Sequence, residues 1–178
     1  MTLWLRRIAI VLVLAAGFHA LAVWALPRMI VTRVMSRGAV RMGINHANAQ
    51  DLPTDKSRLV VQPSPDLLYA ICLYDISTQP LLLESDLPQD YWSLSVFALN
   101  SDNVFAVNDQ QVQTRHPRYL LARDAKPAGL PPDLADLPVI VTPSDLGVVL
   151  FRNLVLDPTD MQDARAAQKS AKCTAVGE

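Results

Sequence analysis

Acidic, amide and phenolic side chains recur between residues 66 and 109, next to the ends of predicted strands. Such groups bind polar ligands through hydrogen bonds, and a carboxylate in a concave site can act as a general base. Because residues at strand ends meet at the rim of a β domain, they predict a ligand-binding rim. The alternative is that Asp and Asn simply form the turns, whose conformations they favour. The rim candidates are Asp66, Tyr69, Tyr74, Asp75, Tyr91, Asn100, Asp102, Asn103, Asn108 and Asp109.

Arg152 is the cation that we add to this set, because it lies within an apolar predicted strand. It shares one strand face with Val148 and Leu150 and should therefore be partly buried. A partly buried guanidinium needs a carboxylate or carbonyl partner. We expect an ion pair with Asp75 or Asp109, and an anion-binding site is the alternative.

The sequence contains none of the motifs GxGxxG, Walker loop, HExxH, GxSxG or CxxC. His46 and His116 have no partner at metal-ligand spacing. The Asn100-x-Asp102 step resembles the start of a calcium loop, but the Gly and the distal Glu of such a loop are missing, so a turn explains it better. We therefore predict no catalytic residue, no metal site and no cofactor. The balance of 16 basic and 17 acidic residues gives no global attraction to nucleic acid.

Composition excludes two further classes of protein. Hydrophobic residues make up 51% of the chain, too many for a disordered protein, and two cysteines are too few for a disulfide-built miniature scaffold. We predict that Cys72 and Cys173 form a disulfide, which requires an oxidising compartment. The alternative is that Cys72 is an ordinary small core residue and Cys173 lies in a frayed tail.

Residues 8–26 (IAIVLVLAAGFHALAVWAL) form an uncharged apolar run. As a helix this run would be about 28 Å long, close to the thickness of the hydrocarbon core, so we predict a membrane anchor within residues 1–27. A cleaved signal peptide is the alternative, because Ala20-Leu21-Ala22 has the form of a cleavage site. Arginines flank both ends and nearly cancel in the positive-inside count. Short N-terminal anchors usually leave the amino terminus inside, which places the remaining chain outside the cytoplasm.

Residues 28–57 are predicted to connect the anchor to a domain. Arg33, Arg37 and Arg41 recur every four residues on one face of a short amphipathic helix at 28–42, opposite an apolar face that includes Val31 and Met35. Such a helix can lie on anionic lipid headgroups, or it can connect the anchor to the domain by packing on it. The polar segment that follows, 43–57, has the composition of a linker.

The domain at 58–178 consists of short apolar runs separated by Pro, Asp, Asn and Ser. This pattern predicts a mainly β fold, an antiparallel β-rich domain with a C-terminal helix, preceded by one transmembrane helix. Thr159 and Gln162 have the spacing of a capping box, which would start the C-terminal helix. The predicted strands are 58–62, 67–74, 81–84, 91–99, 104–107, 118–122, 139–142 and 147–156.

Three segments carry a resemblance to a known family: VVQPSPDLLYAICLYD (60–75), PQDYWSLSVFALNSDNVFAVND (88–109) and TPSDLGVVLFRNLV (142–155). In this order they resemble the bacterial family named domain of unknown function 1254. The chain is similar to the short, membrane-anchored branch, which lacks the second domain (unknown function 1214) of longer members. The resemblance implies a β-rich fold and a membrane or envelope location, and it implies no activity, cofactor or catalytic residue.

Together these observations predict a single-pass protein of the bacterial inner membrane with a periplasmic C-terminal domain. Its partners would be the lipid bilayer, through residues 8–26, and an envelope protein or small ligand bound by the domain, with no nucleic acid. One alternative is an envelope hydrolase that uses Asp66, Asp75 or Asp102 as a general base. Another is an accessory subunit of a membrane complex, with His19 and the span at the interface.

Overall fold

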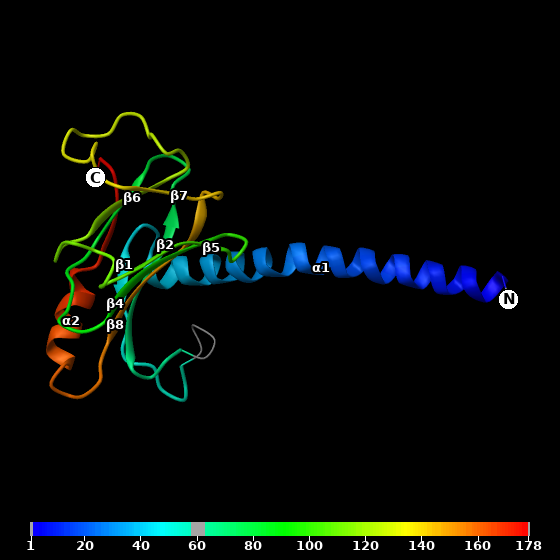
Figure 1. Cartoon of the computed structure of the whole chain (residues 1–178), viewed down its shortest axis with the longest axis horizontal. Helices are drawn as coiled ribbons and strands as arrows, with labels where there is room; N and C mark the ends of the chain where they lie inside the picture. The colour runs from blue at the N-terminus through cyan, green and yellow to red at the C-terminus, as the bar shows by residue number, and fades with distance from the viewer. Residues whose placement is uncertain (1, 58–62, 178) are drawn as a thin grey trace.

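The longest element is helix α1 (Thr2–Met42), which projects from a two-sheet domain as a single rod (Figure 1). The structure, a computed structural model, describes residues 2–57 and 63–177, so the strand predicted at 58–62 lies outside the described residues. At 1.5 Å per residue, the 41 residues of α1 make a helix of about 60 Å. The predicted anchor helix and the predicted amphipathic helix are therefore one continuous element.

Pro27 lies inside α1 without ending it. A proline removes one backbone donor from a helix and crowds the preceding turn. In that turn the Arg28 guanidinium donates to the Trp24 carbonyl oxygen at 2.6 Å. The boundary predicted between residues 27 and 28 is thus absent.

The last third of α1 packs on the domain. Val31 and Met35 are buried against Ile71 and Leu73 of strand β2 (Leu67–Asp75). A Cβ at Gly38 would lie 2.5 Å from Leu73 Cδ1, so glycine permits the helix to approach the sheet closely. Of the two interpretations of residues 28–42, packing on the domain is the one that the structure shows, and the arginine face stays exposed.

The junction after α1 is held by hydrogen bonds, in contrast to the predicted linker. Gly43 ends the helix with a φ of 78°, and the Asn48 side chain donates to the Met42 carbonyl oxygen at 2.6 Å. Asn45 Nδ2 donates to the Asp75 carbonyl oxygen at 2.8 Å, and the Asp75 backbone N–H donates to Asn45 Oδ1 at 2.7 Å. Residues 47–49 then form strand β1 (Ala47–Ala49), which the sequence analysis missed.

Two sheets form the domain. The first, sheet A, has the order β1-β2-β8-β4-β5, and its neighbours are all antiparallel. Sheet B has the order β7-β6-β3-β9, in which only the pair β6–β7 is parallel among the described strands. This architecture confirms the predicted antiparallel-rich β fold. The bounds not yet given are β3 (Leu81–Glu84), β4 (Trp92–Ala98), β5 (Asn103–Asn108), β6 (Arg118–Ala122), β7 (Val139–Val141), β8 (Leu146–Leu154) and β9 (Lys172–Ala175).

The main core lies between the two sheets. Trp92 and Phe151 from sheet A and Leu83 from sheet B are 1%, 1% and 0% exposed and belong to one cluster. In the same cluster Cys72 of β2 and Cys173 of β9 are joined by a disulfide, with a Cα–Cα distance of 6.4 Å. The disulfide that the sequence predicts is therefore present, and it connects the two sheets.

Helix α2 (Met161–Ser170) covers one end of the core, where Ala164 packs on Leu68. The predicted capping box is wrong, because the N-cap is Asp160 and it makes no side-chain capping bond. Asp157 instead accepts bonds from the backbone N–H and the hydroxyl of Thr159. These bonds lower the pKa of the Asp157 carboxyl below its ordinary value.

Candidate functional site

The predicted rim is divided between the two opposite ends of sheet A. Leu67 pairs with Leu154 at one end of β2, and Asp75 pairs with Leu146 at the other. The eight residue steps between them span about 27 Å. The prediction of a single rim was therefore wrong, because each antiparallel strand places its beginning and its end at opposite edges.

At the end of sheet A where Leu67 pairs with Leu154, the candidate residues bond to the backbone of neighbouring segments. The carbonyl oxygens of Asp66 and Tyr91 accept bonds from Val155 and Leu154. Asp109 Oδ1 accepts a bond from the Trp92 backbone N–H at 3.4 Å. These groups hold the strand ends together, and the exposed side chains of Asp66 and Tyr91 project from the edge.

Near the same end, Tyr69 lies on the outer face of sheet A. Its side chain is 8% exposed, and its hydroxyl accepts a bond from the Ser64 backbone N–H at 3.1 Å. On β5, the Asn108 side chain accepts a bond from the Gln110 backbone N–H at 3.2 Å. The hydroxyl of Tyr69 thus ties the segment before β2 to the sheet, and Asn108 forms the turn after β5.

At the opposite end, the acidic and amide candidates form turns. Asp75 Oδ1 accepts a bond from the Ser77 backbone N–H at 2.9 Å. Asn100 Nδ2 donates to Asp102 Oδ2 at 2.6 Å, and the Asp102 backbone N–H donates to Asn100 Oδ1 at 3.3 Å. Asn103 starts β5 beside a register shift in β4. The turn interpretation accounts for Asp75, Asn100 and Asp102, whereas Asn103 is a strand residue.

Tyr74 is the buried candidate residue at this end of sheet A. Its side chain is fully buried and its hydroxyl bonds to Thr142 Oγ1 at 3.0 Å. Burial raises the pKa of the Tyr74 phenol above its ordinary value, because the charged form would lose its hydration. Tyr74 pairs with Gly147, whose missing side chain leaves room for the phenol ring. Tyr74 is therefore a core residue.

Arg152 has no carboxylate partner within ion-pair distance in the described part of the chain. Its Nη1 donates to Ser95 Oγ at 2.9 Å. The predicted ion pair was wrong for a reason of register. Arg152 lies opposite Tyr69, six residues along β2 from Asp75, or about 20 Å. The other expected partner, Asp109, bonds to the backbone of Trp92.

A groove of about 1200 Å³ lies between the end of α1 and the edge strand β1. Three of its lining residues are Arg33, Arg37 and Arg41, which are exposed. No described carboxylate forms an ion pair with any of them. The remaining lining residues are Ile30, Val34, Ser36, Gly38, Val40, Met42, Asn48 and Gln50.

A second hollow of about 330 Å³ adjoins this groove through Gln50, which lines both. Its floor includes Tyr69 and Ile71, so it also opens on the outer face of sheet A. Its one acidic lining residue, Asp51, lies 3.6 Å from the Arg165 guanidinium. The groove and the second hollow together place polar and basic groups where α1 meets the domain.

The sequence did not predict two residues that line the groove, Asn48 and Gln50, or the ion pair between His116 and Asp86. Asn48 and Gln50 line the groove but lay in the predicted linker, and only the pairing of β1 brings them there. His116 Nδ1 bonds to Asp86 Oδ1 between segments 30 residues apart, and both side chains are largely exposed. Within the described residues, no group of three or more side chains is placed to hold a metal ion.

The fold and this surface define a class of protein: a disulfide-closed, two-sheet domain carried on a long apolar N-terminal helix. The family described as "Protein of unknown function (DUF1254)" matches residues 44–175, and the chain belongs to it. The family resemblance of the three sequence segments is thereby confirmed. No curated protein matches the chain.

Two solved structures are similar in fold. One is the VPA0106 protein from Vibrio parahaemolyticus, with 14% identity, a TM-score of 0.66, and 86% of this chain covered. The other is a putative uncharacterized protein from Burkholderia cenocepacia, with 13% identity, a TM-score of 0.51, and 70% of this chain covered. The matched region spans 36% of each of those chains, so this chain matches about a third of their length. At these identities the likeness shows the fold alone.

Proposed function

We propose that this protein is a single-pass binding protein of the bacterial envelope. In this proposal α1 spans the inner membrane, and the two-sheet domain lies on the periplasmic side, where it binds a partner or small ligand next to the bilayer.

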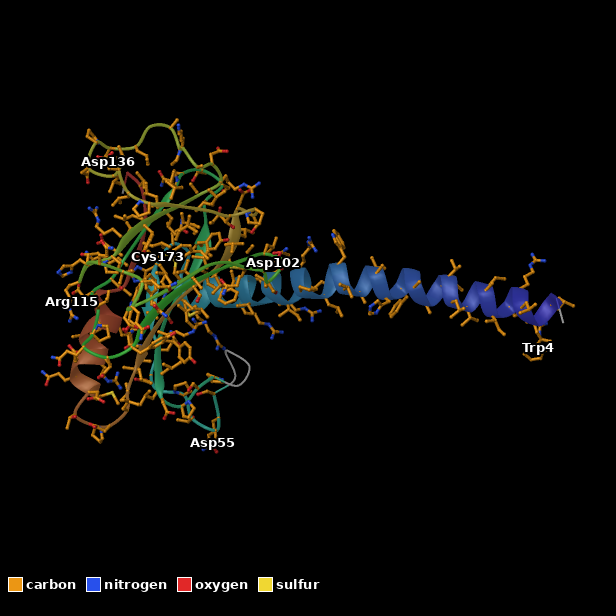
Figure 2. All side chains as sticks on the ribbon, in the orientation of Figure 1. Trp4, Asp55, Asp102, Arg115, Asp136 and Cys173 are labelled. Atoms are coloured by element: carbon orange, nitrogen blue, oxygen red, sulfur yellow. A yellow bond between two sulfur atoms is a disulfide. The ribbon has the colours of Figure 1, made fainter. Side chains whose placement is uncertain are left out.

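The exposed apolar surface of α1 carries the proposal. From Leu3 to Ile30 the large apolar side chains are about half to three-quarters exposed, for example Phe18 at 75%. An 18-residue window of the helix has a mean hydropathy of 2.3, and none of it is buried. An apolar surface of this extent needs a lipid or protein cover, and the length fits a bilayer of about 30 Å. Figure 2 shows Trp4 near the free end, far from the domain.

The disulfide supports the proposed placement of the domain on the periplasmic side of the membrane. Cys72 and Cys173 are 0% and 2% exposed and bonded in the core between the sheets. Disulfides persist in the periplasm and are rare in the reducing cytoplasm. A bond that holds both sheets together therefore favours a domain that folds after export.

The turn geometry favours binding over hydrolysis. Asp75 and Asp102, two of the three carboxylates considered as general bases, bond to neighbouring turn residues, and Asp66 is an exposed strand-end residue. Among the described residues, no specific contact favours the hydrolase alternative. The groove beside α1 is the surface on which we expect binding.

Reporter fusions test the proposal. Alkaline phosphatase fused after Glu178 is expected to be active, and green fluorescent protein at the same position is expected to be dark, because each matures on only one side of the membrane. The control variant Leu14→Arg/Phe18→Arg places two charges in the span, at a cost of about 3 kcal/mol each, and should abolish phosphatase activity. If the green fluorescent protein fusion of the wild type is fluorescent and its alkaline phosphatase fusion is inactive, the proposed topology is contradicted.

A further inference from the structure

We propose that the groove between α1 and β1 binds the phosphate of an anionic phospholipid from the adjoining leaflet, through Arg33 and Arg37. This inference rests on the proposed function, since it requires that α1 spans the bilayer. It names a ligand class, anionic phospholipids, and two binding residues for the groove at which α1 meets the domain.

The charge pattern is the first argument. Residues 42–178 carry ten basic and seventeen acidic residues, so the domain has a balance of −7. An anionic membrane surface repels such a domain. Arg33 and Arg37 lie one turn apart on α1, are exposed, and lack an ion pair with any described carboxylate. The acidic domain thus leaves these two guanidinium groups available for an external anion.

The depth of the arginines is the second argument. The uncharged apolar run ends at Leu26, and beyond Arg28 the side chains of Met29 and Ile30, which are 47% and 59% exposed, extend the apolar surface of α1 to Ile30. At 1.5 Å per residue, Arg33 lies about 5 Å beyond Ile30, and Arg37 lies about 10 Å beyond it. The headgroup layer is about 5–8 Å deep on each side of the hydrocarbon core, and arginine stems extend toward it. Both guanidinium groups therefore reach the phosphate level.

Arg41 lies outside this zone. It is about 17 Å beyond Ile30 and therefore farther from the bilayer. We expect Arg41 to contribute through its charge alone and to matter less than Arg33 and Arg37. The expected effects of the three arginines therefore decrease with their distance from the bilayer.

The groove is the third argument, because it offers the other contacts that a lipid needs. Ile30 lines it on the helix side at the edge of the hydrocarbon and suits the upper part of an acyl chain. On the β1 side, the Asn48 and Gln50 amide nitrogens donate to groups of the junction, such as Met42. In the described part of the chain, no donor bonds to the side-chain oxygens of these two amides. Those oxygens suit headgroup hydroxyls.

The test uses the full chain purified in a neutral detergent. It is mixed with equal amounts of phosphatidylglycerol and phosphatidylcholine, and bound lipids are measured by native mass spectrometry. We expect the wild type to prefer phosphatidylglycerol. Because each basic residue at an anionic surface contributes about 1 kcal/mol, Arg33→Gln/Arg37→Gln should lower this preference about 30-fold, and Arg41→Gln less than fivefold.

The matched control is Lys126→Gln/Lys169→Gln, which removes two exposed domain charges away from the groove. It is expected to keep the wild-type preference, and circular dichroism verifies that all variants fold. An equal loss in the control, or no loss in the arginine double variant, would overturn the proposal. Inorganic phosphate at constant ionic strength should leave lipid binding unchanged, and displacement by it would identify a free anion as the ligand and also overturn the proposal.

Vesicle flotation tests membrane anchoring by α1 separately from the lipid site. Wild type and arginine double variant are both expected to float with vesicles of pure phosphatidylcholine, because the apolar surface of α1 is intact. Failure of the wild type to float would refute the proposed anchoring. Flotation without a preference for phosphatidylglycerol would refute the lipid site alone.

Discussion

Gly147 of β8 lies where the structure has no room for a side chain. A Cβ at this position would be 2.2 Å from the Phe97 carbonyl oxygen and 2.5 Å from the Tyr74 hydroxyl. The first atom belongs to the backbone of the neighbouring strand, and the second to a fully buried ring. Gly147→Ala therefore forces the β4–β8 pairing apart, displaces Tyr74, or both.

The cost follows from these two contacts. Overpacking a core typically costs about 1–3 kcal/mol. Displacing Tyr74 also breaks its buried bond to Thr142 Oγ1, and an unsatisfied buried hydroxyl costs about 1–3 kcal/mol more. We expect Gly147→Ala to lower the free energy of unfolding by about 4 kcal/mol, which corresponds to a fall in Tm of about 8–16 °C for a chain of this size.

Two other glycines provide matched controls. Gly17 has no atom within 4 Å of its hypothetical Cβ, so Gly17→Ala should not destabilise. Gly129 also has open space but a φ of +75°, and Gly129→Ala should cost about 1 kcal/mol through backbone strain alone. Thermal unfolding of the full chain in detergent, followed by near-ultraviolet circular dichroism, compares the three variants. A Tm for Gly147→Ala at or above that of Gly129→Ala would refute the packing argument.

Three further predictions concern the disulfide, the buried phenol and the arginine. Cys72→Ala/Cys173→Ala opens a loop with a sequence separation of 101 and should lower the free energy of unfolding in urea by about 4.7 kcal/mol; two alkylated cysteines in the unreduced, denatured wild type would contradict the bond. Burial raises the pKa of Tyr74 above 10.0, so the contribution of Tyr74 to stability should be constant below about pH 10 and should be lost as the pH rises toward the raised value, because only the unfolded chain then ionises this phenol. Urea midpoints of the wild type and Tyr74→Phe on both sides of that pH measure the effect, and equal slopes for the two would refute it. Arg152→Ala should cost only about 1 kcal/mol, since it loses one bond to Ser95 and no ion pair; a loss of about 3–5 kcal/mol in the same urea assay would restore the buried-pair hypothesis.

The strands that the sequence predicted well have strong local signals. Leu81–Glu84 and Arg118–Ala122 have the predicted bounds, because apolar runs stop at prolines and polar turn residues. Ala47–Ala49 and Lys172–Ala175 were missed for a tertiary reason. The first has only three residues, Ala-Asn-Ala, and pairs with β2 where the end of α1 places it. The second follows a helix directly and completes the edge of sheet B.

The candidate site was predictable only in its residue types. Alternation correctly placed Arg152 on one face with Val148 and Leu150, but periodicity does not reveal what covers that face or which pair lies opposite. The antiparallel register of β2 and β8 separates Asp75 from Arg152, and no local pattern encodes that register. The arginine face of residues 33–41 was visible in the sequence, yet the groove beside it depends on β1, a long-range feature.

The junction at residues 43–50 connects these findings to function. Asn45 bonds to both backbone groups of Asp75, and the Gln50 backbone N–H donates to the Tyr69 carbonyl oxygen at 2.8 Å. Gln168 of α2 donates to the Gln50 carbonyl oxygen at 2.6 Å and to the Tyr69 carbonyl oxygen at 2.8 Å, so both helices contact strand β2. In the proposed topology, a helix fixed in this way would hold the domain in one orientation and keep the groove at a constant depth beside the bilayer.

Protease digestion of intact spheroplasts tests the central claim, a bilayer-spanning α1 with the domain outside the cytoplasm, most directly. Proteinase K added to spheroplasts that express the untagged full chain should remove the domain and leave a membrane-protected fragment that contains α1. The disulfide-closed domain is made cleavable by adding a reductant before digestion, and a cytoplasmic marker protein verifies that the membrane is sealed. A full-length chain that survives in sealed, reduced spheroplasts and disappears only after lysis would contradict the account.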